Sequence, residues 1–218
     1  EKLFDLVRKL EREKGLSLSE YEELIRGRNA ELADFAAERA DRARKEIYGS
    51  DVYVRGLIEI GNVCKNDCFY CGIRKSNASA CRYRLTESEI LDCCREGYSL
   101  GFRTFVLQGG EDGYFTDDII CGIVSNIKSN YPDCAVTLSI GEKSKESYKA
   151  YFDAGADRYL LRHETADESH YRKLHPESMS LSHRKQCLFW LKEIGYQVGS
   201  GFMVGSPYQT VDNLISDL

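Results

Sequence analysis

Apolar residues at helical spacing mark the first fifty residues of the chain. They recur every three or four positions, as on one face of an amphipathic helix: Leu3, Leu6, Val7 and Leu10. The run from Ser19 to Glu22 has the spacing of a capping box and predicts the start of a second helix. A longer, charged helix is expected over about residues 29–48. We therefore predict an N-terminal helical extension over residues 1–50.

From residue 51 onward, short runs rich in β-branched and aromatic residues alternate with helical segments. The expected strands are 52–60, 104–108, 135–140, 158–162 and 197–204. The expected helices begin after Thr86, run over 117–129, 144–154 and 182–194, and begin again at 210. A strand followed by a helix, repeated in series, is typical of a parallel sheet in an α/β fold.

Five βα units in unbroken series predict the first part of a TIM-type (β/α) barrel, because a closed barrel needs eight of them in about 250 residues. The chain lacks an initiator methionine and ends within the fifth expected helix. We therefore expect residues 51–218 to form a C-terminally truncated barrel core, in a fragment whose missing part carries the last strands.

Composition excludes several classes of protein. The net charge of −5 does not favour a nucleic-acid-binding surface. The apolar runs fall far short of the roughly 20 residues that a membrane-spanning helix needs. The charged N-terminal segment does not resemble a secretory signal. We therefore expect a cytoplasmic protein that binds neither nucleic acid nor membrane.

The strongest chemical signal is the run CKNDCFYC, which follows the first expected strand. It places Cys64, Cys68 and Cys71 at CxxxCxxC spacing, with Tyr70 just before the last thiol. Cysteine thiolates at tight local spacing hold iron–sulfur clusters. Three of them leave one iron of a four-iron cluster open, and an open iron can chelate a small molecule.

The chain contains nine cysteines in all. An odd number of cysteines, three of them in a tight cluster, favours a metal site in a reducing compartment over disulfides. Cys81 is a possible fourth ligand, although an ordinary thiol is the more common reading at such spacing. The other five are expected to act as small buried apolar residues: Cys93, Cys94, Cys121, Cys134 and Cys187.

Polar residues follow the expected strands at their carboxyl ends, where the catalytic and binding residues of βα barrels lie. After the second strand come Gln108, Gly109, Gly110 and Glu111. Paired glycines let the backbone approach a ligand closely, although most such pairs are simple turns.

On the third strand, Thr137 and Ser139 share one face. They either point into the barrel or satisfy neighbouring backbone groups. At the end of the fourth strand, Arg162 and Glu164 share a face. They either bind a ligand carboxylate and a diol or form a buried structural ion pair.

No partner spacing supports zinc at His163, which is expected to be a hydrogen-bonded structural residue. His170, His175 and His183 lie in a charged segment that predicts a solvated face. Arg184, at the start of the fourth helix of the barrel, is the residue there that can reach inward.

Together these motifs resemble the radical S-adenosylmethionine (SAM) superfamily. Within it, the chain resembles the FeFe-hydrogenase maturases of the HydE family, in the biotin synthase-like subgroup. The resemblance covers about residues 55–218 and rests on five stretches: NVCKNDCFYCGIR, VLQGGED, VTLSIGE, DRYLLRHETA and GFMVGSP.

The resemblance implies roles for individual residues. Cys64, Cys68 and Cys71 would hold a 4Fe–4S cluster whose fourth iron binds the amino and carboxylate groups of SAM. The stretch from Gly109 to Glu111 would meet the amino group, and Glu164 would bind the ribose hydroxyls. The remaining residues implied to face the cofactor or substrate are Tyr70, Gln108, Thr137, Ser139, Arg162 and Arg184, with the two arginines neutralising carboxylates.

The resemblance also implies a reaction and partners. Reductive cleavage of SAM would give a 5'-deoxyadenosyl radical, with electrons from a ferredoxin- or flavodoxin-type donor. The radical would act in building the bridging dithiolate ligand of the hydrogenase di-iron site. The substrate would be a small molecule or a small iron–cysteine complex, delivered by another hydrogenase maturase.

Several alternatives share parts of this pattern. Biotin synthase and methylornithine synthase share the barrel and the activation chemistry. Biotin synthase is disfavoured because an asparagine–histidine pair is expected where Arg162, His163 and Glu164 stand. An iron–sulfur carrier or scaffold would normally close its cluster with four thiolates. A zinc knot would also need a fourth ligand, which only Cys81 offers.

Overall fold

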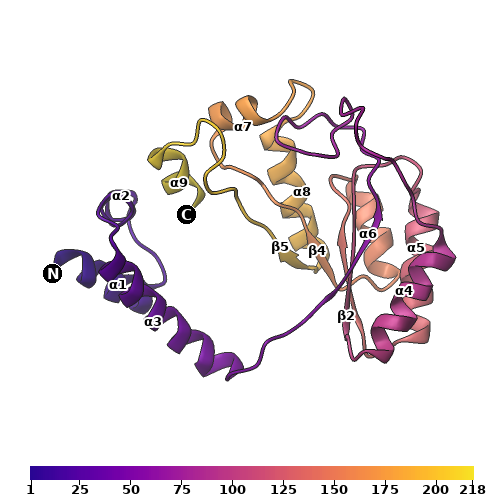
Figure 1. Cartoon of the computed structure of the whole chain (residues 1–218), viewed down its shortest axis with the longest axis horizontal. Coiled ribbons are helices and arrows are strands. Elements are labelled where there is room, and N and C mark those ends of the chain that lie inside the picture. The colour runs from indigo at the N-terminus through magenta and orange to yellow at the C-terminus, as the bar shows by residue number, and fades with distance from the viewer. The chain divides into compact units, whose positions relative to one another are not determined.

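The computed structural model describes residues 1–218, which divide into two compact units. One unit comprises Glu1–Tyr53, Thr165–His170 and Met203–Leu218, and the other comprises Val54–Glu164 and Tyr171–Phe202. The first unit contains α1 (Lys2–Glu13), α2 (Leu18–Arg26), α3 (Ala30–Tyr48) and α9 (Val211–Asp217) (Figure 1). None of the helices in the chain is long and apolar enough to cross a membrane.

The N-terminal helices form where the apolar spacing predicts them. The capping box of α2, however, is Ser17 with Glu20, two residues earlier than the predicted one. The Ser17 side chain accepts from the Glu20 amide, and the Glu20 carboxylate accepts from the Ser17 amide at 2.9 Å. Asn29 caps α3 by accepting from the Leu32 amide at 2.8 Å, which confirms the predicted start of that helix.

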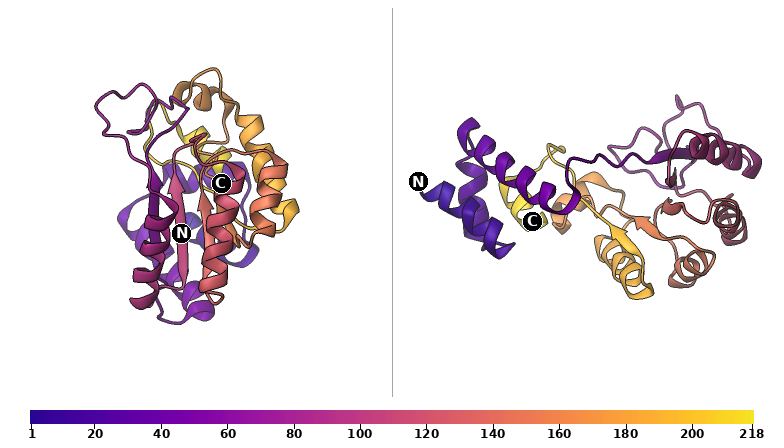
Figure 2. Two further views of the ribbon diagram at one scale, coloured as in Figure 1. Left: turned by 90° about the vertical axis from the view of Figure 1, so that its right-hand side faces the viewer. Right: turned by 90° about the horizontal axis from the view of Figure 1, so that it is seen from below.

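The second unit contains one parallel sheet of five strands in the order β1-β2-β3-β4-β5. The strands are β1 (Gly56–Gly61), β2 (Thr104–Gly109), β3 (Ala135–Ser139), β4 (Arg158–Leu160) and β5 (Gln197–Gly199). Helices α4 (Glu87–Ser99), α5 (Asp117–Asn130), α6 (Lys145–Asp153) and α8 (Leu181–Ile194) connect them and cover the outer face of the sheet (Figure 2). Sequential strand order with a helix after each strand confirms the predicted part of a TIM-type barrel.

Three strand boundaries differ from the sequence prediction by more than one residue. β1 begins at Gly56 rather than 52, because pairing with β2 starts there and the preceding Val52 is 83% exposed. β4 ends at Leu160 and β5 at Gly199, beyond which a single bridge joins Glu164 to Phe202. The predicted strand ends at 162 and 204 are therefore wrong. A short helix, α7 (Glu168–Leu174), was not predicted.

The core of this unit lies between the sheet and the covering helices. It is built from apolar strand residues such as Phe105 and Leu138 and helix residues such as Ile123. Two buried tyrosines form hydrogen bonds to backbone carbonyls in this core. The Tyr159 hydroxyl donates to the Gly141 carbonyl at 2.7 Å, and the Tyr196 hydroxyl donates to the Tyr148 carbonyl at 2.8 Å. The first of these bonds fixes the loop between β3 and α6, which borders the site described below.

Candidate cluster and cofactor site

A cavity of about 310 Å³ lies at the carboxyl ends of the strands. The structure brings together there all the predicted site residues except Thr137: Cys64, Cys68, Tyr70, Cys71, Gln108, Gly109, Gly110, Glu111, Ser139, Arg162, Glu164 and Arg184. All of these residues belong to the second unit. Residues that come from three loops, the ends of β2 and β3 and one helix therefore meet in one place, at the carboxyl ends of the strands.

The loop between β1 and α4 carries the three cysteines, and each thiol is free and partly buried. The Cys71 amide donates to the Cys68 carbonyl at 3.0 Å, which turns the chain so that both side chains reach the cavity. The Phe69 amide donates to the Leu174 carbonyl at 2.9 Å and ties this turn to the end of α7. The backbone of the loop is thus held by one hydrogen bond within the turn and one to the end of α7.

One arginine that the sequence analysis did not single out organises the cysteine loop. The Arg82 guanidinium donates to four backbone carbonyls, those of Asn62, Ile73, Arg74 and Asn77, over 2.6–3.1 Å. These carbonyls lie in an irregular segment without a sheet or helix to satisfy them. A single side chain therefore replaces the hydrogen bonds that regular secondary structure would supply.

We predict that Arg82→Met loosens this loop without unfolding the sheet. Hydrogen bonds to a charged group contribute about 1.5–3 kcal/mol each, and methionine keeps the apolar stem but supplies none. Limited proteolysis should cut the variant within residues 62–82 several times faster than the unchanged protein. Arg95→Met is the matched control, because Arg95 is exposed and its bond is to Asp92 on its own helix. Equal cleavage rates for the two variants would contradict the role given to Arg82.

Gly110 lets the cysteine loop lie directly on the loop after β2. A Cβ atom at Gly110 would come within 2.3 Å of the Val63 carbonyl oxygen and 2.7 Å of the Cys64 Cβ. The Lys65 amide donates to the Glu111 carbonyl at 2.9 Å and joins the two loops. The second glycine of the pair thus serves close packing of protein against protein at the cluster loop.

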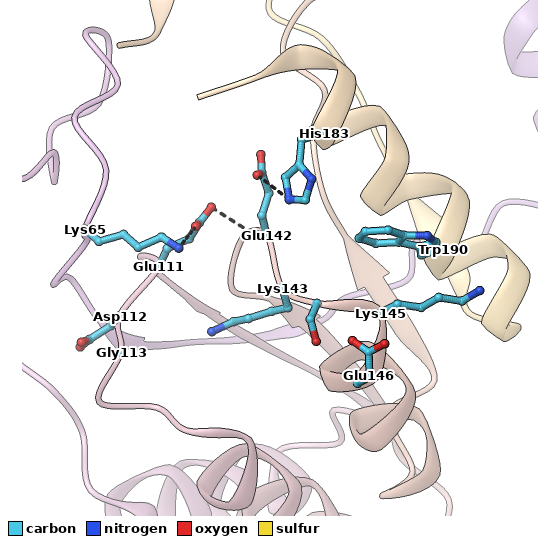
Figure 3. A pocket seen from close by; sticks show the side chains of 11 residues that line it. Lys65, Glu111, Asp112, Gly113, Glu142, Lys143, Lys145, Glu146, His183 and Trp190 are labelled. Atoms are coloured by element: carbon cyan, nitrogen blue, oxygen red, sulfur yellow. Dashed lines mark hydrogen bonds and ion pairs between the residues drawn. The ribbon is translucent and has the colours of Figure 1, made fainter. Parts of the chain in front are cut away.

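Glu111 lies at the border of two cavities, with its carboxylate already bonded. It accepts from the Glu142 amide at 3.0 Å and lies 3.3 Å from the Lys65 ammonium (Figure 3). Gly141, at φ +80°, leaves the space for it, because a Cβ there would lie 2.1 Å from the Glu111 Cγ. Gly109, Gly110 and Glu111 border the cluster cavity.

Glu164 has a strained backbone and a buried side chain. Its φ is +69°, a conformation that non-glycine residues rarely adopt and that concentrates at functional sites. The side chain is 10% exposed, and its burial raises the pKa of the carboxyl group, although the positive charges of Arg162 and Arg184 act to lower it. The Arg162 Nε lies 3.8 Å away on a side chain that is 60% exposed, which is too loose for a buried structural pair.

Arg184 reaches inward from α8, as predicted. Its Nη1 donates to the Arg162 carbonyl at 3.1 Å, and its Nε lies 2.9 Å from the Glu142 Oε1. Burial disfavours the charged guanidinium, but the interactions with Glu142, Tyr171 and Glu111 together outweigh it and raise the pKa of Arg184. A permanent positive charge therefore stands at the wall of the cavity, where a carboxylate would be recognised.

Tyr70 is held by a histidine that the sequence analysis assigned to a solvated face. The Tyr70 hydroxyl lies 3.2 Å from the His175 Nε2, and the His175 Nδ1 lies 3.0 Å from the Tyr171 carbonyl. The exposure prediction for His175 is wrong, since the residue is 2% exposed, and His170 at 1% is buried as well. The formation of α7 turns these two residues inward, which the surrounding charged sequence did not indicate.

The polar residues of the middle strands lie at two depths. Ser139 lines the cavity, and the Gln108 amide donates to the Glu59 carboxylate at 3.4 Å. Thr137 lies two residues deeper on β3, where its buried hydroxyl has no hydrogen-bond partner and does not line the cavity. Ser139 therefore points into the cavity, where it can contact a ligand, whereas Thr137 does not.

The other cysteines stand apart from the cavity. Cys81 is exposed and does not line it, so the structure offers no fourth thiolate from that position. Cys94, Cys134 and Cys187 are buried, as expected, Cys121 is only partly buried, and Cys93 is exposed and contradicts the prediction. The site therefore has three cysteine donors, with Met179 Sδ 3.5 Å from the Cys68 Sγ.

The donor set fits a 4Fe–4S cluster with one open iron. Three free thiols line one cavity, and thiolates at this spacing are the ligands of such clusters. Burial raises the pKa of the Cys68 thiol to about 11, against the pull of Arg184. A coordinated thiol loses its proton outright, so metal binding would overcome this shift.

Comparison with known proteins gives the same assignment. The sequence profile of the Radical SAM superfamily matches residues 58–218. The FeFe hydrogenase maturase subunit HydE of Thermotoga maritima is 48% identical over 82% of this chain and 51% of that protein. The 3-methylornithine synthase of Methanosarcina acetivorans is 29% identical over 76% of this chain and 47% of that protein. The chain spans about half the length of these curated relatives.

Solved structures share the fold over almost the whole chain. Methylornithine synthase (PylB) matches with a TM-score of 0.88 at 25% identity, over 97% of this chain and 62% of that one. The hydrogenase maturase HydG matches with a TM-score of 0.85 at 24% identity, over 98% of this chain and 49% of that one, which concerns the fold alone. With its profile match and its three-cysteine cavity, the chain belongs to the Radical SAM superfamily, whose members use a 4Fe–4S cluster and S-adenosylmethionine, and it resembles HydE.

Proposed function

We propose that the complete protein is a radical SAM enzyme of FeFe-hydrogenase maturation. The observation that carries the proposal is one cavity lined by the three cysteines, Glu164 and Arg184, in a chain that is 48% identical to HydE. When bound, the cluster supplies the electron that cleaves SAM to methionine and a 5'-deoxyadenosyl radical. The residues of the chain bind and orient the cofactor.

Each side of the cavity has a distinct task in this proposal. Cys64, Cys68 and Cys71 hold the cluster, and the backbone after β2 meets the amino group of SAM. The Arg184 guanidinium, which lines the cavity and is held beside Glu142, faces the carboxylate of SAM. Glu164 accepts hydrogen bonds from the ribose hydroxyls.

The finer part of the proposal concerns the substrate. The reaction would contribute to the bridging dithiolate ligand of the hydrogenase di-iron site. A small iron–cysteine complex, or another small molecule, would be the substrate. A ferredoxin- or flavodoxin-type protein would donate electrons, and other hydrogenase maturases would deliver and receive intermediates.

Methylornithine synthase is the second candidate. The structural match to that enzyme, with a TM-score of 0.88, favours it, whereas the higher sequence identity to HydE favours the maturase. Both activities would share the cofactor site, because the cleavage of SAM is common to them. The substrate alone distinguishes the two proposals.

The test uses the full-length protein after anaerobic iron–sulfur reconstitution. Dithionite and SAM are added, and 5'-deoxyadenosine is measured by chromatography. Its formation supports radical SAM chemistry, whereas an iron-loaded protein that forms none would be a carrier or scaffold. The protein is then added to FeFe-hydrogenase and the other maturases. Restored hydrogenase activity supports the maturase, and formation of 3-methylornithine instead supports the second candidate.

We predict that Glu164→Gln weakens SAM binding without loss of iron. The amide keeps the shape of the side chain but removes the charge that strengthens hydrogen bonds to the ribose. A loss of about 1.5–3 kcal/mol corresponds to roughly 10- to 100-fold weaker binding. Anaerobic equilibrium dialysis with the reconstituted protein measures the affinity. Glu146→Gln on α6 is the control, since it is exposed and lies outside the cavity. Unchanged affinity in Glu164→Gln would favour a structural role for the carboxylate.

A further inference from the structure

Three side chains with metal-ligand chemistry meet outside the cluster cavity. Glu142, His183 and Cys187 each offer one ligand atom, and the three atoms lie within 4.8 Å of one another. The His183 Nε2 lies 3.6 Å from the Glu142 Oε2 and 3.7 Å from the Cys187 Sγ. Figure 3 shows the Glu142 carboxylate and the His183 ring turned toward each other.

The local sequence explains why these three residues converge. His183 and Cys187 are four residues apart on α8, so they share one face of the helix. Glu142 follows Gly141, whose left-handed backbone and bond from Tyr159 fix the loop after β3. Each ligand position is therefore held by an element that the fold already orders.

The spacing fits a small tetrahedral cation. Zinc bonds of about 2.0–2.2 Å to nitrogen and oxygen and about 2.3 Å to sulfur imply ligand atoms roughly 3.3–3.6 Å apart. The 3.6 and 3.7 Å distances from the His183 Nε2 are close to this range, and the ligand atoms of Glu142 and Cys187 lie within 4.8 Å of each other. A set of one nitrogen, one sulfur and one carboxylate oxygen suits zinc-class ions, whereas magnesium and calcium require oxygen ligands.

The carboxylate also has spare coordinating capacity. Its Oε1 is buried and lies 2.9 Å from the Arg184 Nε, but the alignment does not make a hydrogen bond. Its Oε2 faces His183. Together, a carboxylate and a thiolate outweigh the single positive charge of Arg184, so a divalent cation can be accommodated beside it.

The fourth coordination position would be open. Glu142 and His183 line a cavity of about 610 Å³, together with Lys65, Glu111 and Trp190 (Figure 3). Water or a small ligand can enter this space beside the three protein ligands. Three protein ligands with one free position are typical of zinc sites that act on a ligand rather than serve structure alone.

We propose that Glu142, His183 and Cys187 form a second metal site, which binds a zinc-class divalent cation with one exchangeable position. The site is separate from the cluster cysteines, although Glu142 links it through Arg184 to the cofactor cavity. It goes beyond the proposed function and does not depend on it. Removal of one ligand should weaken zinc binding more than about 100-fold, since even partners of metal ligands cost 10- to 100-fold.

The test uses the full-length protein with its cluster reconstituted, one equivalent of zinc and a competing chelator. Zinc K-edge absorption spectroscopy reports the zinc shell independently of iron. We expect one sulfur at about 2.3 Å and nitrogen or oxygen at about 2.0–2.2 Å. His183→Ala should lose the zinc, and it is well suited because the side chain is half exposed. Cys187→Ser should lose the sulfur shell, while Cys93→Ser on α4 is the matched control and should lose nothing.

Each other outcome counts against the site. Failure of the unchanged protein to retain zinc against the chelator would overturn the proposal. Zinc retained by His183→Ala with its shell unchanged would do the same. A shell of two or three sulfurs would place the ion on the cluster cysteines, which would signal a failure of cluster assembly as well as of the new site. Absence of SAM cleavage with the expected zinc shell would affect the proposed function alone.

Discussion

Cys68→Ala should remove the four-iron cluster from the reconstituted full-length protein. Cys68 is the middle thiol of the three that line the cavity, and the remaining two thiolates cannot hold a four-iron cluster. We expect the visible absorbance and the bound iron to fall by about tenfold or more, with SAM cleavage lost. Iron analysis and anaerobic absorbance spectra measure this directly.

Cys81→Ala is the control for this experiment. Cys81 follows the cluster thiols in sequence, but it is exposed and does not line the cavity. The control should therefore keep both iron and absorbance. Full cluster absorbance in Cys68→Ala would contradict the assignment of Cys68 as a ligand. Loss of the cluster in Cys81→Ala would support Cys81 as a fourth ligand.

The sequence predicts those features of the site that depend on residues close together along the chain. The cysteine spacing, and the rule that functional residues follow barrel strands, predict that Cys64, Gly109, Ser139 and Glu164 lie at one end of the sheet, but the sequence leaves open whether Ser139 and Glu164 face a ligand. The strand and helix periods also sufficed for the order of the sheet, because a strand and the helix after it are neighbours along the chain.

Contacts between distant segments were not predictable in the same way. Glu142 and His183 are 41 positions apart in the printed sequence, and nothing in either local pattern indicates that they meet. His175 stands among charged residues and was assigned to solvent, but α7 turns it against Tyr70. Arg82 resembles any loop arginine until its four carbonyl partners are known. Such roles depend on tertiary packing, which a single sequence does not encode as a spacing.

The glycine pair after β2 lies where the sequence predicts, but the predicted reason for the glycines is incomplete. The position of Gly109 and Gly110 after a strand predicts that they belong to the site, because glycines let a ligand approach the backbone closely. At Gly110 the structure adds a nearer neighbour, the cysteine loop itself. The glycine therefore positions the cluster ligands, and its replacement should act on the cluster before it acts on the cofactor.

Gly110→Ala should displace Cys64 and impair cluster assembly. The added methyl group would lie 2.3 Å from the Val63 carbonyl oxygen and 2.7 Å from the Cys64 Cβ, distances that no side-chain rotation relieves. The backbone of the cysteine loop must shift, and overpacking of this kind costs about 1–3 kcal/mol. We expect reconstituted iron to fall by at least about half, since the thiolates need a fixed geometry.

Gly113→Ala separates this steric effect from a general effect on the loop. Gly113 lies three residues further along the same loop, and a Cβ there would meet nothing within 4 Å. The control should keep its iron and its free energy of unfolding. Thermal unfolding of both apoproteins shows whether Gly110→Ala remains folded, so that iron loss in a folded protein can be assigned to the displaced cysteine. Normal iron content in a folded Gly110→Ala protein would show that the loop tolerates the methyl group, and Gly110 would then have no role in placing the cluster ligands.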